Sequence, residues 1–360
     1  MITEMNQILP RISYGDATSC QAIEIRNYLK AKGMNSTIYV NDIDEKMNGE
    51  AKLLSEEKPG KGTPLIYHHS IGSEVANMAM HHEGIKICIY HNITPCHFFR
   101  NYNPILYHYT KQGREQLDMI RDSVNISFGD SEYNCRELKD RGFKNVNLLP
   151  IIVNPSKWDI DHDPSIIERY DGHNTKNIIF VGRIAPNKCQ KDLVRFFYFF
   201  NQIIPDSRLF LVGSYKERER YFQEVAFEIK RLDLENKVIL SGHVSDAELK
   251  SYYLVSDLFL SFSEHEGFGV PLIEAMWFDI PVLAYKCSAV PETLGDAAFM
   301  FTDKKNLKRT AFLAKYISTN NEISKSIILS QRKRRSEFLP GRIHTIIENS
   351  IEKIYAMTQQ

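Results

Sequence analysis

One stretch, from Asp257 to Tyr285, constrains the fold of this chain more than any other and reads DLFLSFSEHEGFGVPLIEAMWFDIPVLAY. Its first apolar run, Leu258 to Phe262, predicts a buried strand, and a turn with two glycines follows it. The residues from Val270 to Phe278 predict a helix, and those from Ile280 to Tyr285 predict a second buried strand. In such a unit the turn lies at the carboxyl end of the first strand, where doubly wound α/β sheets bind their ligands.

Two carboxylates flank this turn. Glu266 precedes it and Glu274 lies in the predicted helix, eight positions later. The start of that helix offers unpaired backbone N–H groups to an anion. A carboxylate pair beside an anion site suits the hydroxyl groups of a ligand rather than its phosphate.

The string EGFGVPLIEA resembles, nearly residue for residue, the E-x7-E signature of the family 4 retaining glycosyltransferases. The residues that carry the resemblance are Glu266, Gly267, Phe268, Gly269, Pro271, Glu274 and Ala275. It implies an α/β fold of GT-B architecture, with two Rossmann-like domains whose parallel sheets face each other across a cleft. It also implies that Glu274 binds the ribose of a nucleotide sugar and Glu266 its sugar ring. Backbone N–H groups from Phe268 to Val270, including Gly269 after Gly267, would help to hold sugar and phosphate.

Length and composition agree with a two-domain cytoplasmic protein. Single cores seldom grow beyond about 250 to 300 residues, and this chain has 360. Its 45 basic and 45 acidic residues balance, which argues against a nucleic-acid partner. Six cysteines without a C-x-x-C pair indicate a reducing compartment. The first residues lack a signal-peptide pattern, and no run of about 18 apolar residues occurs, so we expect peripheral contact with the inner membrane at most.

The first half alternates apolar runs with amphipathic stretches, as a parallel sheet covered by helices does. We expect residues 1–165 to form a Rossmann-like, acceptor-side domain. The expected strands are Thr37 to Val40, Leu65 to His68, Ile85 to His91, Val124 to Phe128 and Val146 to Ile152, and the expected helices end at Gly33 and cover Glu74 to His82, Ile105 to Arg121 and Glu132 to Asp140.

Two places in this half are candidates for function. His91 ends a predicted strand, and by resemblance a histidine at the end of such a strand contacts the donor sugar; the alternative is a structural histidine bonded to a loop. The acceptor-side candidates are Gly15 and Asp16 in the first turn, where many family members have paired glycines, and His68 and His69 in a strand-end loop. A metal site at the histidines is not expected, because they lack the spacing of metal ligands.

From about Asn154 to Thr175 the chain is rich in Pro, Asp, Asn and Gly, which predicts an interdomain linker. We expect a nucleotide-sugar-binding domain at residues 172–335. Its first strand, Asn177 to Val181, precedes the sequence GRIAPNK. By resemblance Gly182, Arg183 and Lys188 hold the donor diphosphate, where fixed cations stabilise charge on the leaving group. The turn Gly242-His243-Val244 corresponds to a family loop near the nucleotide base.

The end of the chain is predicted to be helical. By resemblance to the family, residues 336–360 are expected to form a helix that crosses back to the first domain. The basic cluster Arg332-Lys333-Arg334-Arg335 has two interpretations, a solvated helix face or a contact with anionic lipid. Phe278-Asp279 stands where many family members carry two small residues.

Three functions compete at this stage. The first is a retaining hexosyltransferase that uses a nucleoside diphosphate sugar, without a metal or other cofactor, with His91, Glu266, Arg183 and Lys188 as its catalytic residues. Its acceptor would be a glycan or lipid-linked oligosaccharide of bacterial surface polysaccharide synthesis. The segments YHNITP and SEYN resemble those of bacterial O-antigen or capsule mannosyltransferases, which favours GDP-mannose as the donor. The second is another nucleotide-sugar enzyme such as an epimerase, and the third is a catalytically silent binding subunit. A nicotinamide dehydrogenase is excluded, because no G-x-G-x-x-G follows a strand.

Overall fold

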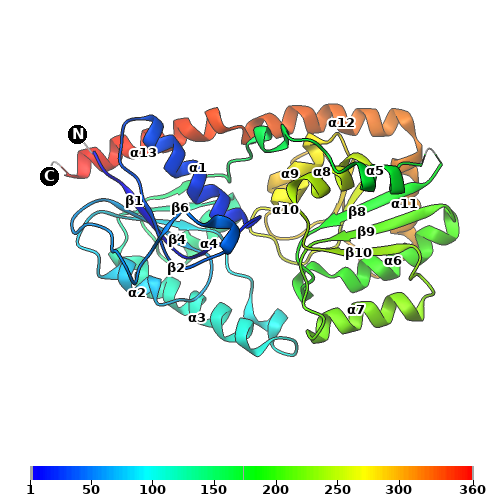
Figure 1. Ribbon diagram of the computed structural model, residues 1–360, viewed down its shortest axis with the longest axis horizontal. Coiled ribbons are helices and arrows are strands. Elements are labelled where there is room, and N and C mark those ends of the chain that lie inside the picture. The colour runs from blue at the N-terminus through cyan, green and yellow to red at the C-terminus, as the bar shows by residue number, and fades with distance from the viewer. Residues whose placement is uncertain (1–2, 173, 359–360) are drawn as a thin grey trace. The chain divides into compact units, whose positions relative to one another are not determined.

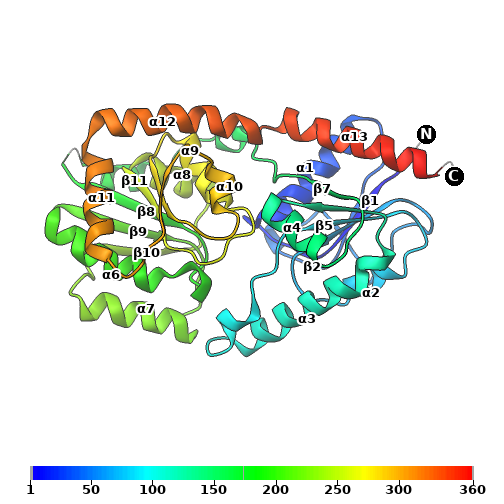
Figure 2. The same cartoon turned by 180° about the vertical axis from the view of Figure 1, so that it is seen from behind.

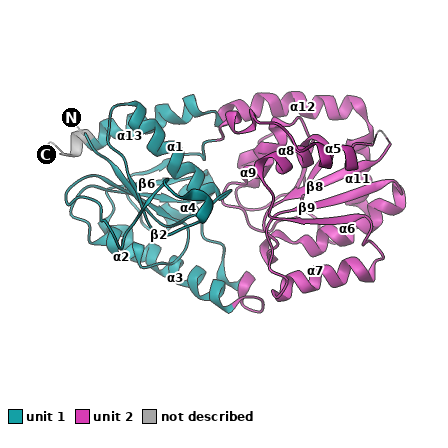
Figure 3. Cartoon of the chain, viewed as in Figure 1, with its two compact units in different colours: residues 1–97, 104–152, 338–360 teal, residues 98–103, 153–337 magenta. Residues whose placement is uncertain are grey.

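The computed structural model describes residues 3–172 and 174–358, and the chain divides into two compact units (Figures 1 and 3). Unit 1 contains the residues up to His97, Pro104–Ile152 and those from Phe338 onward. Unit 2 contains Phe98–Asn103 and Val153–Glu337. The sequence predicted that the first domain ends at residue 165. In the structure the chain enters unit 2 at Val153, and the earlier segment Phe98–Asn103 also belongs to unit 2.

Unit 1 is built on a parallel sheet that, within the described residues, has seven strands in the order β3-β2-β1-β4-β5-β6-β7. The strands are β1 (Asn6–Ile12), β2 (Ile38–Ile43), β3 (Lys52–Leu53), β4 (Leu65–His69), β5 (Lys86–Tyr90), β6 (Ile126–Gly129) and β7 (Val146–Leu148). The helices are α1 (Ala17–Ala31), α2 (Val75–Met80), α3 (Pro104–Ile120), α4 (Glu132–Asp140) and α13 (Pro340–Thr358). The sequence analysis named neither β1 nor the short β3.

Alternate residues of each strand in unit 1 enter different cores, as the two-residue period of a strand requires. On one face Leu65 and Tyr67 of β4 pack with α2 and α3. On the other face, Ile66 packs with α1 and α13. Figure 2 shows these two helices on the same side of the sheet. Ile343, Ile347 and Ile354 of α13 belong to this second core, so the expectation that the last helix packs on the first domain is confirmed.

Unit 2 is built on a second parallel sheet, with six strands among the described residues in the order β10-β9-β8-β11-β12-β13. The strands are β8 (Lys176–Val181), β9 (Ser207–Val212), β10 (Val238–Gly242), β11 (Leu258–Ser261), β12 (Val282–Tyr285) and β13 (Phe299–Phe301). The helices are α5 (Pro164–Tyr170), α6 (Gln190–Ile203), α7 (Arg220–Arg231), α8 (Asp246–Leu254), α9 (Val270–Trp277), α10 (Val290–Leu294), α11 (Leu307–Thr319) and α12 (Asn321–Arg335).

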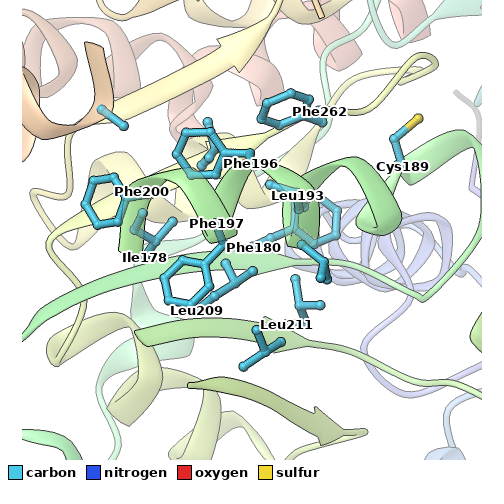
Figure 4. Packing of buried hydrophobic residues seen from close by; sticks show 14 of the residues in the cluster. Ile178, Phe180, Cys189, Leu193, Phe196, Phe197, Phe200, Leu209, Leu211 and Phe262 are labelled. Carbon is cyan, nitrogen blue, oxygen red and sulfur yellow. The ribbon is translucent and has the colours of Figure 1, made fainter. Parts of the chain in front are cut away.

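The aromatic run of α6 forms the centre of one core of unit 2 (Figure 4). Phe196, Phe197 and Phe200 are fully buried against Ile178 and Leu209 of the neighbouring strands. Burying a phenylalanine side chain stabilises the fold by about 1.5 to 3 kcal/mol. The other face of the sheet packs against α5, α8, α9 and α10. Both faces are therefore covered, which explains the continuous apolar runs of these strands.

The stretch from Asn154 to Thr175 is not an extended linker. It contains a short 3-10 helix, Pro155–Trp158, and α5, with Asn154 and Asp163 as their N-caps and a proline at the start of each. Trp158, Ile166 and Tyr170 are buried in the second core of unit 2. The Asn, Asp and Pro residues that suggested a linker are instead helix-start residues.

The basic cluster at the end of α12 has a structural role that neither sequence interpretation anticipated. Arg335 donates hydrogen bonds to the carbonyl oxygens of Met276 and Trp277 at the end of α9, at 2.6 and 3.2 Å. Arg332 and Arg335 both bind the carboxylate of Asp279, which has a left-handed φ of 54°. These cations satisfy and neutralise the carboxyl-terminal end of α9. Among the described helices, none is both long and apolar enough to cross a membrane.

Candidate nucleotide-sugar site

The candidate residues of unit 2 lie at the carboxyl edge of its sheet. The chain runs from β8 outward to β10 and then returns to the other side of β8 with β11. The loops after β8 and β11 therefore start side by side and lead to helices on opposite faces. Such a switch point is where open α/β sheets bind ligands. The first loop carries Gly182, Arg183 and Lys188, and the second carries Glu266 and Gly269.

Two hydrogen bonds, one between main chains and one from a side chain, fasten these loops together. The amide of Glu264 donates to the carbonyl oxygen of Asn187 at 2.8 Å, and the Asn187 side chain donates to the carbonyl oxygen of His265 at 3.3 Å. As a result the Lys188 Nζ lies 2.6 Å from Glu266 Oε2. The structure thus brings together two residues that the sequence assigned to the diphosphate and to the sugar.

The turn between Glu266 and the start of α9 requires glycine at its second glycine position, Gly269. Gly269 has a φ of 92°, and a Cβ at this position would lie 2.8 Å from Leu272 Cδ1. It is the N-cap of α9, so the amide of Val270 lies at the start of the helix. The carbonyl oxygen of Phe268 accepts a hydrogen bond from Thr293 Oγ1 at 2.5 Å, which ties the turn to α10. Gly267 lies between Glu266 and this anchored segment.

Glu274 is nearly buried on α9, with 8% of its side chain exposed. Its Oε2 accepts a hydrogen bond from the Tyr253 hydroxyl at 3.0 Å, and its Oε1 lies 3.3 Å from Lys157 Nζ. Lys157 is also 3.3 Å from Asp246 Oδ1. Burial, and next the charge of Glu274, raise the pKa of Tyr253, which therefore stays protonated and donates. Sequence reasoning missed both partners of Glu274.

Arg183 does not join the Lys188 pair among the contacts described. Its guanidinium binds Glu219 at 3.0 Å, just before α7, and its side chain is 42% exposed. The chain around it is fixed by a close backbone approach: a Cβ on Gly213 would lie 2.3 Å from the carbonyl oxygen of Gly182. The requirement for glycine at position 213 was another feature that the sequence analysis did not identify.

The loop after β10 is the third predicted contact. Gly242 has a φ of 74° and its carbonyl oxygen accepts from the amide of Gly213 at 3.1 Å, so this loop adjoins the one after β9. His243 is exposed, and Val244 packs partly into the second core. Ser245 and Glu248 then form the capping box of α8.

In unit 1 the first predicted candidates serve the start of α1. Gly15 has a φ of 75°. The Asp16 carboxylate is the N-cap and accepts hydrogen bonds from the amide and the hydroxyl of Ser19, both at 2.9 Å. This is a structural role, and an acceptor contact by either residue stays a prediction.

The three histidine candidates lie at the carboxyl edge of the first sheet. His69 is buried between the Tyr67 hydroxyl, at 2.7 Å from its Nδ1, and the Gly113 carbonyl oxygen, at 2.8 Å from its Nε2. Burial lowers the pKa of His69 to about 4. His68 and His91 are joined through ring nitrogens 2.9 Å apart.

His91 has both ring nitrogens occupied. Its Nδ1 lies 2.9 Å from Asp130 Oδ2, and its side chain is only 4% exposed although the residue as a whole is partly exposed. The accessible surface of His91 is therefore mostly main chain. Any contact of His91 with a ligand, as the sequence predicted, has to use that surface unless the ring leaves its partners.

Among the described residues, one group has ligand atoms close enough for a metal ion, namely Cys189, Asp192 and Glu264. The Lys304 ammonium already lies 3.1 Å from Asp192 Oδ2 and 2.7 Å from Glu264 Oε1. A cation at this position would compete with a lysine that neutralises the same carboxylates.

The chain is similar to known proteins in sequence and in fold. Residues 167–334 match the family model described as glycosyl transferases group 1. The chain is 33% identical over 154 residues to mannosylfructose-phosphate synthase of Agrobacterium fabrum, covering 41% of this chain and 34% of that protein. It is 27% identical over 127 residues to O-antigen chain mannosyltransferase B of Escherichia coli, covering 34% and 32%. The chain thus spans only about a third of these two relatives.

The fold is shared over a greater length. The crystal structure of Anabaena HepE in complex with UDP and glucose superposes with a TM-score of 0.74 at 16% identity, covering 98% of this chain and 100% of that one. The expected fold class, two parallel-sheet α/β domains as in GT-B glycosyltransferases, is confirmed. Arg183, Lys188, Glu266 and Glu274 all lie in residues 167–334, the part of the chain that matches the model of the glycosyl transferases group 1 family.

Proposed function

We propose that this protein is a retaining glycosyltransferase that moves a hexosyl group from a nucleoside diphosphate sugar to a hydroxyl group of a glycan or lipid-linked oligosaccharide. The observation that carries the proposal is the Lys188–Glu266 pair at the switch point of unit 2, inside the region that matches the family model. A cation for phosphate and a carboxylate for sugar hydroxyls lie next to each other there, as a donor with both groups requires.

The residues divide the donor among them. Lys188 and Arg183 bind the diphosphate and stabilise the charge that develops on it as the glycosidic bond breaks. Glu266 binds the sugar hydroxyls and Glu274 the ribose, while the amide at the start of α9 adds an anion contact. The acceptor hydroxyl attacks the anomeric carbon from the face that the leaving diphosphate vacates. The departing phosphate oxygen takes up the proton of that hydroxyl. Since lysine and arginine supply the positive charge, no divalent metal is required.

Mannose is the sugar that we favour, in the synthesis of a bacterial surface polysaccharide. The names of two relatives, mannosylfructose-phosphate synthase and O-antigen chain mannosyltransferase B, support this choice. The structure of HepE with UDP and glucose supports a nucleotide sugar in general and keeps UDP-glucose as a second donor to test.

A thermal-shift screen with GDP-mannose, UDP-glucose and their free nucleoside diphosphates tests the proposal. A ligand at 100 times its Kd stabilises the folded state by about 2.7 kcal/mol, which raises the melting temperature measurably. Stabilisation by one donor, followed by transfer of its labelled sugar to a glycan with retained anomeric configuration, is the expected result. The absence of stabilisation by every nucleotide sugar contradicts the proposal.

The same experiment separates the two alternatives. An epimerase returns the donor with an altered sugar and needs no acceptor. A silent binding subunit is stabilised by the donor but leaves it unchanged with any acceptor. The ion-paired state of Lys188 and the near burial of Glu274 favour a working donor site over a silent one.

A further inference from the structure

A row of polar side chains crosses the sheet of unit 1 from the interior of β1 to the carboxyl edge at the ends of β5 and β6. Gln7, His68, His91 and Asp130 come from β1, from β4, and from the residues directly after β5 and β6, which are neighbours in the sheet. The side chains of Gln7 and His68 are fully buried, and those of His91 and Asp130 are 4% and 1% exposed. A buried polar row of this length needs an explanation, because unpaired buried polar groups are costly.

The hydrogen bonds along the row fix where its protons lie. The Gln7 amide nitrogen donates to the Ala22 carbonyl oxygen at 2.9 Å, which turns its Oε1 toward His68 Nε2 at 2.8 Å. His68 must therefore donate from Nε2. Its Nδ1 is then left to accept, so His91 donates from Nε2 across 2.9 Å.

One more proton lies at the far end of the row. The His91 Nδ1 is 2.9 Å from Asp130 Oδ2, and two acceptors cannot bond without a proton between them. The three hydrogen bonds thus hold three protons, one more than two neutral imidazoles and a carboxylate carry. With that proton the row has no net charge, which suits its burial.

The proton beyond those of two neutral imidazoles lies between His91 and Asp130 rather than on His68. His91 touches the carboxylate directly, whereas the outer partner of His68 is a neutral amide. Burial, and next the charge on His91, lower the pKa of His68 well below its usual value. The Asp130 Oδ1 has no hydrogen-bond partner in the described structure, so His91 is the one group seen to compensate this carboxylate.

We propose that Asp130 is the positioning residue of His91: it holds the ring as an imidazolium with both nitrogens bonded, and thereby fixes the exposed main chain of His91 at the carboxyl edge of the sheet. His68 accepts the hydrogen bond from His91 Nε2, and Gln7 in turn accepts from His68 Nε2. Asn92, next in the chain, has a left-handed φ of 63°, and its buried amide donates to Asn134 at 2.8 Å. The backbone at this edge is therefore held on both sides. The kinetic part of this inference rests on the proposed function.

The protonation of the parent chain tests the first half directly. In a long-range proton–nitrogen NMR spectrum of the full chain with ¹⁵N-labelled histidine at neutral pH, both ring nitrogens of His91 should be protonated. His68 should show protonation at Nε2 alone. His69 is an internal reference, because the Gly113 carbonyl oxygen forces its proton onto Nε2. An unprotonated ring nitrogen on His91 in the parent chain overturns the inference. This measurement uses the parent chain alone, so it does not depend on the folding of any variant.

The Asp130→Asn variant tests the positioning role. The asparagine amide can donate to His91 Nδ1, so His91 should become a neutral ring with its proton on Nε2, while His69 is unchanged. With whichever probe donor, GDP-mannose or UDP-glucose, is active, kcat should fall roughly tenfold to a hundredfold at similar KM, because a misplaced group costs this much. Asp118→Asn is the matched control, since Asp118 binds Arg141 on the surface of the same unit.

The outcomes are distinguishable from those of the proposed function. A parent chain that transfers no sugar contradicts the proposed function, and the NMR spectra then still decide the state of His91. If transfer occurs and Asp130→Asn has the kinetics of Asp118→Asn, the positioning role is wrong. If Asp130→Asn does not fold, Gln7→Leu removes the end of the row instead, and the proton of His68 should then leave its fixed position on Nε2.

Discussion

Lys188 Nζ and Glu266 Oε2 lie 2.6 Å apart, although 78 residues separate them in the chain. Both side chains are partly buried, with 24% and 13% exposed. Each side chain is therefore the ion-pair partner of the other before a donor binds. When a diphosphate binds Lys188, Glu266 loses part of its partner and gains the sugar hydroxyls in exchange. The pair therefore connects the two halves of the proposed donor.

The first prediction concerns the cations. Lys188→Ala and Arg183→Ala should each lower kcat by about 10²- to 10³-fold, because each acts on charge that develops in the transition state. Turnover at saturating donor is the measurement. Lys191→Ala is the matched control, since Lys191 lies three residues later and is also ion-paired, with Glu224 at 2.7 Å. Normal turnover in both site variants would remove the diphosphate assignment.

The second prediction separates the two glutamates. Glu274→Gln should weaken binding of the bare nucleoside diphosphate about tenfold or more, because a charged hydrogen bond contributes about 1.5 to 3 kcal/mol. Glu266→Gln should spare or strengthen that binding, since it releases Lys188 for phosphate, while sugar transfer falls. Calorimetry with the nucleoside diphosphate measures both. The reverse order of affinities would show that the two roles are exchanged.

Much of unit 2 could be predicted from the sequence. Its strands are continuous apolar runs with glycine turns at their ends, and both signals are local. The helix from Val270 and the strands on either side of it are found where the sequence placed them, to within a few residues.

The contacts of the site could not be predicted in the same way. Lys157 and Glu274 are 117 positions apart, and nothing in either local sequence indicates the other. The same holds for His91 and Asp130: the sequence identified His91 as a candidate but gave no indication of Asp130. The linker error has a different cause: Asn154 and Asp163 are equally suited to a loop and to an N-cap, and only packing of Trp158 and Tyr170 distinguishes these states.

The third prediction follows from Lys157. Lys157→Met leaves Glu274 nearly buried with the Tyr253 hydroxyl as its remaining described partner, which favours its protonated form. Nucleoside diphosphate binding should weaken about tenfold, in the direction of Glu274→Gln and not additively with it. Lys250→Met is the control, because Lys250 binds the carbonyl oxygens of Trp158 and Ile160 and, among the described residues, pairs with no carboxylate. Equal losses of nucleoside diphosphate affinity in Lys157→Met and Lys250→Met would mean that the effect comes from disturbing the segment around Trp158, not from removing the charge beside Glu274.

The fourth prediction is that transfer survives a chelator. In the proposed site Lys188 and Arg183 neutralise the negative charge of the diphosphate. The carboxylates of Asp192 and Glu264, which could otherwise hold a metal ion, already bind Lys304. Activity with excess EDTA should equal that of the untreated protein. Loss of activity that Mg²⁺ or Mn²⁺ restores would overturn the metal-free mechanism, and calorimetry with each ion would then locate the site.

The last prediction is that unit 1 is sensitive to mild acid. The pKa of His69 is lowered by burial from 6.5 to about 4. Between these values the unfolded chain binds a proton that the folded chain does not, so stability falls as pH falls through this window. The loss should be roughly 3 kcal/mol for His69, and His68 contributes in the same direction.

Urea unfolding at several pH values measures this effect. Far-UV circular dichroism is the suitable probe, because both tryptophans, Trp158 and Trp277, lie in unit 2. His69→Gln preserves a donor for Gly113 and an acceptor for Tyr67 without a titratable ring, so it should flatten the dependence between pH 6.5 and 4. His81→Gln, at an exposed position, should leave it unchanged. If the parent and His69→Gln lose stability equally over this range, the acid sensitivity does not originate at His69.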